Sequence, residues 1–187
     1  MNGVAVAAAV AAFLQFIALL LTIGVMIRNG HRQLRAYVLP ENGGILDGTM
    51  LNPPQPARAG IPGVVLLIKN SGQTPAYEVV HWAQIEVVPV QDENRALVVP
   101  PMQKQYSSTL GSGGMTNKAL WCGRALTPGE ILEVANGTRA IYLFGRIEYK
   151  DAFKKPHFTN FRLHYIGQFP PVPGAILYFS ERGNDSN

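Results

Sequence analysis

A long uncharged apolar run near the N-terminus constrains this chain more than any other feature. Residues 4–27 hold no charged side chain, and Arg28, Arg32 and Arg35 follow closely. A helix rises about 1.5 Å per residue, so the run reaches roughly 36 Å and can cross a hydrocarbon core about 30 Å thick. We therefore predict a transmembrane helix over 4–27, with a tip over 1–3 and a basic juxtamembrane segment over 28–35.

The run fits a cleaved signal peptide or a soluble core helix less well. A signal peptide starts with a positive region and has an apolar core of about 7–15 residues, whereas here no Lys or Arg precedes Arg28 and the run is longer. A helix of a soluble core normally keeps a polar face, and only Gln15 and Thr22 interrupt this run. The pattern therefore favours an anchor that stays in the membrane.

The flanking charges predict the side of the membrane on which the rest of the chain lies. Lys and Arg are retained on the cytoplasmic side of a membrane helix, and three arginines follow the run while none precedes it. We expect the C-terminal domain to face the cytoplasm. Arg28, Arg32 and Arg35 are then placed to contact anionic headgroups at the membrane surface.

Small residues gather in the first half of the predicted helix. They are Gly3, Ala7, Ala8, Ala11 and Ala12. Such spacing lets two membrane helices approach closely. Self-association through the membrane helix is therefore one candidate interaction, in addition to contact with the lipid bilayer.

The remainder of the chain is nearly neutral. Of the 16 Lys and Arg residues, three lie in the juxtamembrane segment, which leaves 13 against 12 Asp and Glu over residues 36–187. Nucleic-acid binding requires clustered cations that replace condensed counterions, so the composition argues against a nucleic-acid partner. Cys122 is the only cysteine, which excludes an internal disulfide and fits a reducing compartment.

Residues 36–180 show the short apolar segments and frequent turn residues of one β domain. Strands are predicted over 36–39, 64–69, 77–88, 96–99, 106–110, 118–121, 139–149, 159–165 and 175–179, with a turn over 41–44. Thr127, Pro128 and Glu130 are typical of a helix start, which predicts one short helix over 128–136. We predict an antiparallel immunoglobulin-like sandwich followed by a disordered tail over 181–187, with a small β-barrel as the alternative.

The strand predicted over 139–149 alternates strictly between two faces. Ile141, Leu143 and Ile147 lie on one face, and Tyr142 and Phe144 lie on the other. The aliphatic face suits the core. We therefore expect Tyr142 and Phe144 to be exposed, and they form the candidate protein-interaction site.

Side chains that could support chemistry are few. Cys122 with His157 and Asp151 could line a pocket for a small ligand or a reaction, but a thiol nucleophile needs a lowered pKa and an oriented base. A lone cysteine beside a tryptophan more often serves as a small buried hydrophobe. His157 and His164 are seven residues apart on a presumed strand and so lie on opposite faces. We predict no catalytic, cofactor-binding or metal-binding residue.

Four segments together resemble an uncharacterised bacterial family of single-pass membrane proteins. They are Arg35-Ala36-Tyr37-Val38, the segment NSGQTPAY over 70–77, the segment GRIEYKD over 145–151 and His157-Phe158-Thr159. The family is marked by RAYV, N-x-GQTPAY and G-x-I-x-Y-x-D-x-F segments that follow one N-terminal membrane helix. The resemblance implies topology, fold class and a bacterial inner (plasma) membrane, and it brings no activity. Lys154 departs from the family, in which glycine is expected at this position.

The segment over 70–77 also has a structural role that its residues predict directly. Pro75 forces Thr74 towards an extended conformation, and Gly72 relieves the turn. Asn70 can bond the backbone locally. We therefore interpret these residues as a turn and not as a ligand-binding loop.

Two functional hypotheses follow for the domain. The first is a membrane-tethered β-sandwich that acts as a protein-interaction or accessory module for an unidentified partner. The second is a membrane-tethered enzyme or small-ligand sensor with a pocket near Cys122, Asp151 and His157. We favour the first, and the predicted fold class drives this preference.

Overall fold

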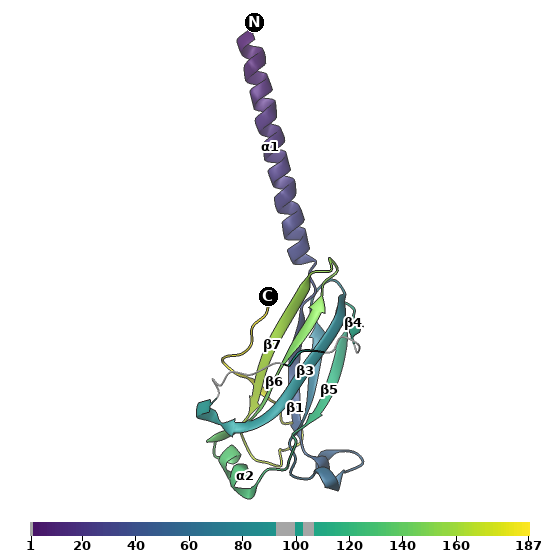
Figure 1. Cartoon of the computed structure of the whole chain (residues 1–187), viewed down its shortest axis with the longest axis vertical. Helices are drawn as coiled ribbons and strands as arrows, with labels where there is room; N and C mark the ends of the chain where they lie inside the picture. The colour runs from purple at the N-terminus through teal and green to yellow at the C-terminus, as the bar shows by residue number, and fades with distance from the viewer. Residues whose placement is uncertain (1, 93–99, 103–106) are drawn as a thin grey trace. The chain divides into compact units, whose positions relative to one another are not determined.

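The computed structural model describes residues 2–92, 100–102 and 107–187 (Figure 1). The strand predicted over 96–99 and the first residue of the strand predicted over 106–110 lie outside the described residues. The chain divides into two compact units, residues 1–35 and residues 36–187. Each unit has its own internal structure.

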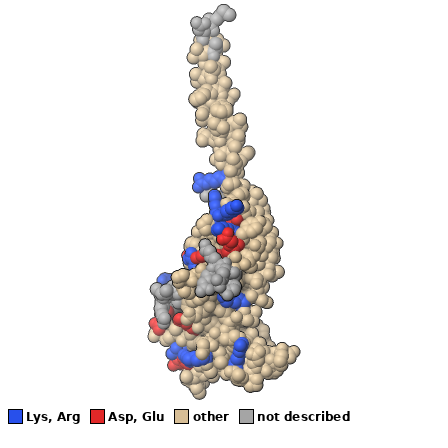
Figure 2. All heavy atoms as spheres, turned by 45° about the vertical axis from the view of Figure 1, so that its right-hand side comes forward, with Lys and Arg blue, Asp and Glu red and all other residues tan. Residues whose placement is uncertain are grey.

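The first unit is a single helix, α1 (Asn2–Gln33). Its stretch Val6–His31 is long and apolar enough to cross a membrane, and none of its apolar surface is buried within the protein. Figure 2 shows that the visible surface of α1 carries charged side chains only near its C-terminal end. The chain therefore begins with an apolar helix that could serve as an anchor.

The second unit consists of two antiparallel sheets (Figure 1). The first sheet has the order β1-β2-β5, with β1 (Val38–Leu46), β2 (Gly63–Asn70) and β5 (Met115–Trp121). The second has the order β4-β3-β6-β7-β8, with β4 (Ser108–Leu110), β3 (Ala76–Pro89), β6 (Arg139–Lys150), β7 (Pro156–Tyr165) and β8 (Tyr178–Phe179). The predicted mainly β fold with two antiparallel sheets is confirmed, and the sheets do not close into the alternative barrel.

Short helical elements connect the strands. The 3₁₀ turns η1 (Gly48–Met50) and η2 (Pro56–Arg58) lie between β1 and β2, and η3 (Val90–Asp92) follows β3. The helix α2 (Pro128–Ala135) lies between β5 and β6, where the sequence predicts it.

The core lies between the two sheets. The inner positions alternate along the strands, as expected for a sheet with one face packed. Fully buried side chains on these positions are Val38, Val64, Leu66, Ile68, Val79, Ile141, Leu143, Ile147, Phe161 and Leu163. The predicted inner face of the strand over 139–149 is therefore correct.

The predicted turn over 41–44 is wrong, because β1 runs through it. Pro40 pairs with Ile68 and Asn42 pairs with Leu67, so Glu41 is an extra residue in a β-bulge. The bulge absorbs the residue without ending the strand. The Glu41 carboxylate forms an ion pair with the Lys69 ammonium group at 2.9 Å.

The C-terminal tail also differs from the prediction, because it pairs with the sheet. Ser186 forms a bridge with Thr159, and the Asn160 N–H donates to the Asp185 carbonyl at 2.8 Å. Upstream of β8, the Leu177 N–H donates to the Gly43 carbonyl of β1 at 2.7 Å. The tail therefore pairs with β7, whereas the segment over 175–179 contacts both sheets. The polar sequence of the tail gives no sign of this pairing because backbone groups make the bonds.

Candidate functional site

Tyr142 and Phe144 do not form the exposed site that the sequence predicts. They are only 4% and 3% exposed. β6 lies in the middle of its sheet, with β3 on one side and β7 on the other, so side chains of both neighbours cover its outer face. The ring centroids of Trp82 and Phe144 lie 5.6 Å apart in an edge-on arrangement, and those of His164 and Tyr142 lie 6.0 Å apart.

The structure brings Asp151 and His157 together. Nε2 of His157 lies 2.9 Å from Oδ2 of Asp151, and Oδ1 accepts the N–H groups of Phe153 and Lys155, both at 2.9 Å. Burial disfavours the charged carboxylate, yet the bonds from His157 and from the two backbone amides hold the pKa of Asp151 below its ordinary value. This carboxylate therefore organises the β6–β7 loop.

Cys122 lies at the other end of the domain. It follows Trp121, which pairs with Gly63 at the start of β2, and its N–H donates to the Pro62 carbonyl. Asp151 instead follows Tyr149 and Lys150 at the end of β6, and the Tyr149 hydroxyl reaches the Ala36 carbonyl just before β1 begins. The predicted pocket of Cys122, Asp151 and His157 is therefore wrong, because the strands separate its members.

A small hollow of about 220 Å³ lies beside His157. The charged side chains around it are already paired: Lys150 with Glu78 at 2.6 Å and Arg146 with Glu148 at 2.9 Å. Arg146 also lies over the Phe158 ring at 4.0 Å. These ion pairs stabilise the outer face of the sheet. The described residues that line this hollow include no Ser, Thr or Cys that could act as a nucleophile with His157 as its base.

The described residues also hold no group of three or more His, Cys, Asp or Glu side chains that could bind a metal ion. His164 bonds Ser180 through Nδ1 at 3.1 Å, and His157 bonds Asp151. His164 therefore links β7 to Ser180, and His157 stabilises the β6–β7 loop.

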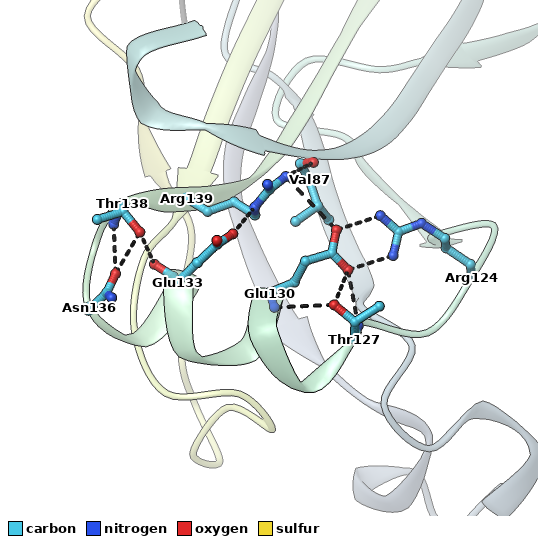
Figure 3. Close-up of polar contacts among 8 residues, drawn as sticks. All are labelled: Val87, Arg124, Thr127, Glu130, Glu133, Asn136, Thr138 and Arg139. Atoms are coloured by element: carbon cyan, nitrogen blue, oxygen red, sulfur yellow. Dashed lines mark hydrogen bonds and ion pairs between the residues drawn. The ribbon is translucent and has the colours of Figure 1, made fainter.

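A second polar cluster fixes α2 against the end of the sandwich (Figure 3). Thr127 is the N-cap, and its hydroxyl accepts the Glu130 N–H while the Glu130 carboxylate accepts the Thr127 N–H, at 3.2 and 3.0 Å. This is the predicted helix start with both reciprocal bonds formed. Arg124 donates two hydrogen bonds to the same carboxylate, at 2.7 and 2.6 Å.

Arg139 links the other end of α2 to the sheet. Its Nε donates to the Glu133 carboxylate at 2.7 Å, and its Nη1 donates to the Val87 carbonyl at 3.2 Å (Figure 3). The cluster thus connects α2, β3 and β6 through satisfied charges. We interpret it as a structural clamp.

We expect this clamp to make stability depend on acid pH. Bonds from Arg124 and from the Thr127 backbone lower the pKa of Glu130 from 4.5 to about 2. Because the folded pKa is the lower one, Glu130 stabilises the fold above pH 4.5, and this contribution is lost as the pH falls towards 2. The free energy of unfolding of Glu130→Gln should be about 1 kcal/mol below that of the wild type at pH 7, and the gap should close towards pH 2.

Denaturant unfolding of both proteins between pH 2 and 7 measures this gap. Glu181→Gln, which neutralises an exposed carboxylate, is the matched control and should differ little from the wild type at any pH. A gap for Glu130→Gln that stays constant down to pH 2 would contradict the assignment.

A surface that sequence reasoning missed is the outer face of the three-stranded sheet. Leu39, Val65 and Met115 are 38%, 37% and 56% exposed there, and Leu67 is half-buried. The register places Leu39 opposite Lys69 and Lys69 opposite Met115, so these side chains extend across all three strands. We call Leu39, Val65, Leu67 and Met115 the apolar face. The unbroken apolar run over 64–68 is the signal for it, although a strand buried on both sides has the same pattern.

The predicted membrane-surface arginines belong to the first unit. Arg28 lies within α1, Arg35 follows its end, and the side chain of Arg32 lies outside the described residues. Their contact with lipid stays a prediction.

The fold defines a class of protein: a domain of two antiparallel sheets that follows one N-terminal apolar helix. Comparisons of the chain with protein-family models, with curated proteins and with solved structures find no match. The function of the domain must therefore be inferred from its own structure.

Proposed function

We propose that this chain is a single-pass membrane protein whose β domain binds another protein through the apolar face. The observation that carries the proposal is the exposure of Leu39, Val65 and Met115 on the outside of the three-stranded sheet. Antiparallel sheets that face water on one side normally present polar side chains there. Apolar side chains gathered on such a face are typical of an interaction site.

The other outer face of the domain supports this choice by contrast. On the five-stranded sheet, Tyr142 and Phe144 are buried, and the Arg146–Glu148 ion pair lies on the same face of β6. The apolar side chains of the central strand β6 are therefore covered on this face, whereas Leu39, Val65 and Met115 are open on the three-stranded sheet. The apolar face itself carries one ion pair, between Lys69 and Glu41. A matching partner presents an apolar surface with charges that complement this pair.

The test is site-specific photo-crosslinking in the native membrane. A photoreactive residue replaces Met115, and the crosslinked species are separated by mass and identified by mass spectrometry. We expect one discrete adduct with a different protein, because Met115 is the most exposed side chain of the apolar face. Val65→Glu places a charge within the same face, so we expect it to reduce the adduct about tenfold or more.

Leu132 provides the matched control. It is 68% exposed on α2, outside the apolar face, so a photoreactive residue at this position should give no discrete adduct. An adduct with twice the mass of the chain would show an interface between copies and overturn the proposal of a different partner. Adducts with lipid alone, or equal adducts from both positions, would also overturn it.

We further propose that the domain faces the cytoplasm of a bacterial inner membrane. The excess of arginine after the apolar run supports this orientation, and the resemblance to bacterial single-pass proteins supports the membrane. A reporter enzyme that is active only outside the cytoplasm, fused after Asn187, should be inactive. An active fusion would reverse the orientation.

A further inference from the structure

A second hollow, of about 620 Å³, lies where β3, β4 and the β6–β7 loop meet. Sites for small ligands usually enclose about 300–1,000 Å³. We call this hollow the Tyr77 pocket. Its lining is formed by Tyr77, Glu78, Ser107, Ser108, Thr109, Lys150, Asp151, Ala152 and Lys154.

The backbone around the Tyr77 pocket departs from regular strand geometry. β3 has a bulge between Tyr77 and Val80, where it pairs with both β4 and β6. Glu78 within this bulge has a φ of +50°, and Lys154 in the β6–β7 loop has a φ of +61°. Bulges re-aim side chains beside functional sites, and left-handed residues other than glycine cluster at ligand sites. Both outliers line the same pocket.

Of the four charged side chains that line the Tyr77 pocket, only that of Lys154 has no described partner of opposite charge. Glu78 is paired with Lys150 at 2.6 Å, and the Asp151 carboxylate is already engaged by His157 and two backbone N–H groups. Lys154 is exposed, and no described carboxylate pairs with it. A ligand with a negative charge at one end could therefore form an ion pair with Lys154.

The remaining lining is suited to hydroxyl groups. Three consecutive exposed residues carry hydroxyl groups: Ser107, which precedes β4, and Ser108 and Thr109, which lie within it. Each hydroxyl can both donate and accept a hydrogen bond. Tyr77 is partly exposed and offers an aromatic ring and a phenolic oxygen. The pocket thus combines two ammonium groups, of which that of Lys150 is paired with Glu78, with several neutral polar groups.

The Tyr77 pocket lies at the end of the domain where the chain enters. The Tyr149 hydroxyl donates to the Ala36 carbonyl at 3.2 Å, and Lys150 and Asp151 follow Tyr149 directly. α1 ends at Gln33, three residues before Ala36. Leu34 and Arg35 therefore join α1 to the residue from which this end of the domain begins.

We propose that the Tyr77 pocket binds a phosphate ester of a polyol, with the phosphate at Lys154 and the polyol hydroxyls at the neutral polar groups of the lining, among them Thr109 and Tyr77. This is the chemistry of an anionic lipid headgroup such as phosphatidylglycerol, and also of soluble glycerol phosphate. The proposal does not depend on the apolar face, which lies on the other sheet. It adds a ligand site to the proposed protein-binding function.

The test uses the full chain purified in an uncharged detergent and titrated calorimetrically with four probes. They are short-chain phosphatidylglycerol, glycerol 1-phosphate, inorganic phosphate and short-chain phosphatidylcholine. We expect saturable binding of the first two and none of the last. Tighter binding of phosphatidylglycerol identifies a lipid headgroup, whereas equal binding of the first two identifies a soluble ester. No saturable binding, or equal binding of inorganic phosphate or phosphatidylcholine, overturns the proposal.

Two variants of neighbouring lysines separate the Tyr77 pocket from general surface attraction. Lys154→Gly removes the cation, and glycine accepts the positive φ without strain, so the melting temperature should stay the same or rise. We expect it to weaken binding about tenfold, the usual effect of losing a charge-assisted bond. Lys155→Gln removes one charge from the same loop outside the pocket lining and should change binding by less than about twofold. Equal weakening by both variants overturns the pocket assignment.

Discussion

Gly145→Ala is expected to lower the free energy of unfolding of the β domain by about 3 kcal/mol or more. Gly145 lies in β6 between β3 and β7. A Cβ at this position would overlap the Trp82 carbonyl oxygen and lie 2.9 Å from the Ala83 Cα and 2.6 Å from the Phe161 ring. The first two atoms belong to the backbone of the neighbouring strand, so relief would require the strands to separate.

Denaturant unfolding of the full chain in detergent, followed by circular dichroism, measures this loss. Gly123→Ala is the matched control, because a Cβ there meets nothing within 4 Å, and we expect a change below about 0.5 kcal/mol. Adding Phe161→Leu to Gly145→Ala should not restore stability, since the contact with the β3 backbone remains. A loss below about 1 kcal/mol for Gly145→Ala would contradict the close approach of β6 to β3.

Local sequence patterns predict the elements that depend on local chemistry. The apolar run predicts α1, the alternation over 139–149 predicts the inner face of β6, and Thr127 with Glu130 predicts the start of α2. Each of these signals lies within a few residues of the element that it defines. This is why they could be recognised without knowledge of the rest of the chain.

The features that were missed depend on partners far along the chain. Glu41 to Gly44 has turn residues but remains in β1, because β2 pairs with it on both sides of the bulge. Tyr142 and Phe144 are buried because β6 has a neighbour on each side. A single strand carries no information on its position within a sheet, so alternation alone cannot tell a covered outer face from an open one.

The candidate sites were predictable only in part, for the same reason. Asp151 and His157 are six residues apart and meet across one loop, as a local interpretation allows. Cys122 could be placed only after the strand order was known. Lys154 has a φ of +61°, a conformation that glycine adopts without strain, and no pattern in the residues around it predicts this.

Asn70 connects the turns at the entrance of the β domain. Its side-chain oxygen accepts the Tyr37 and Gly72 N–H groups at 3.2 and 3.0 Å. Its amide nitrogen donates to the carbonyls of Thr74, Leu110 and Gly111 at 2.8, 3.1 and 3.1 Å. The side chain is fully buried, so the interpretation of the segment over 70–77 as a turn agrees with a structural role that extends to β1 and to the β4–β5 loop.

Asn70→Asp should therefore lower the free energy of unfolding by about 3 kcal/mol or more at pH 7, because a buried carboxylate would face three carbonyl oxygens. Ser112→Ala is the matched control at the same corner: it removes one bond, to the Gly72 carbonyl at 2.8 Å, and should cost about 1 kcal/mol. The surrounding carbonyls raise the pKa of the new carboxyl, so protonation at acid pH restores one donor and should recover part of the loss. Denaturant unfolding at pH 7 and pH 4 measures both effects. Equal losses for the two variants at pH 7 would show that Asn70 contributes no more than an ordinary turn residue.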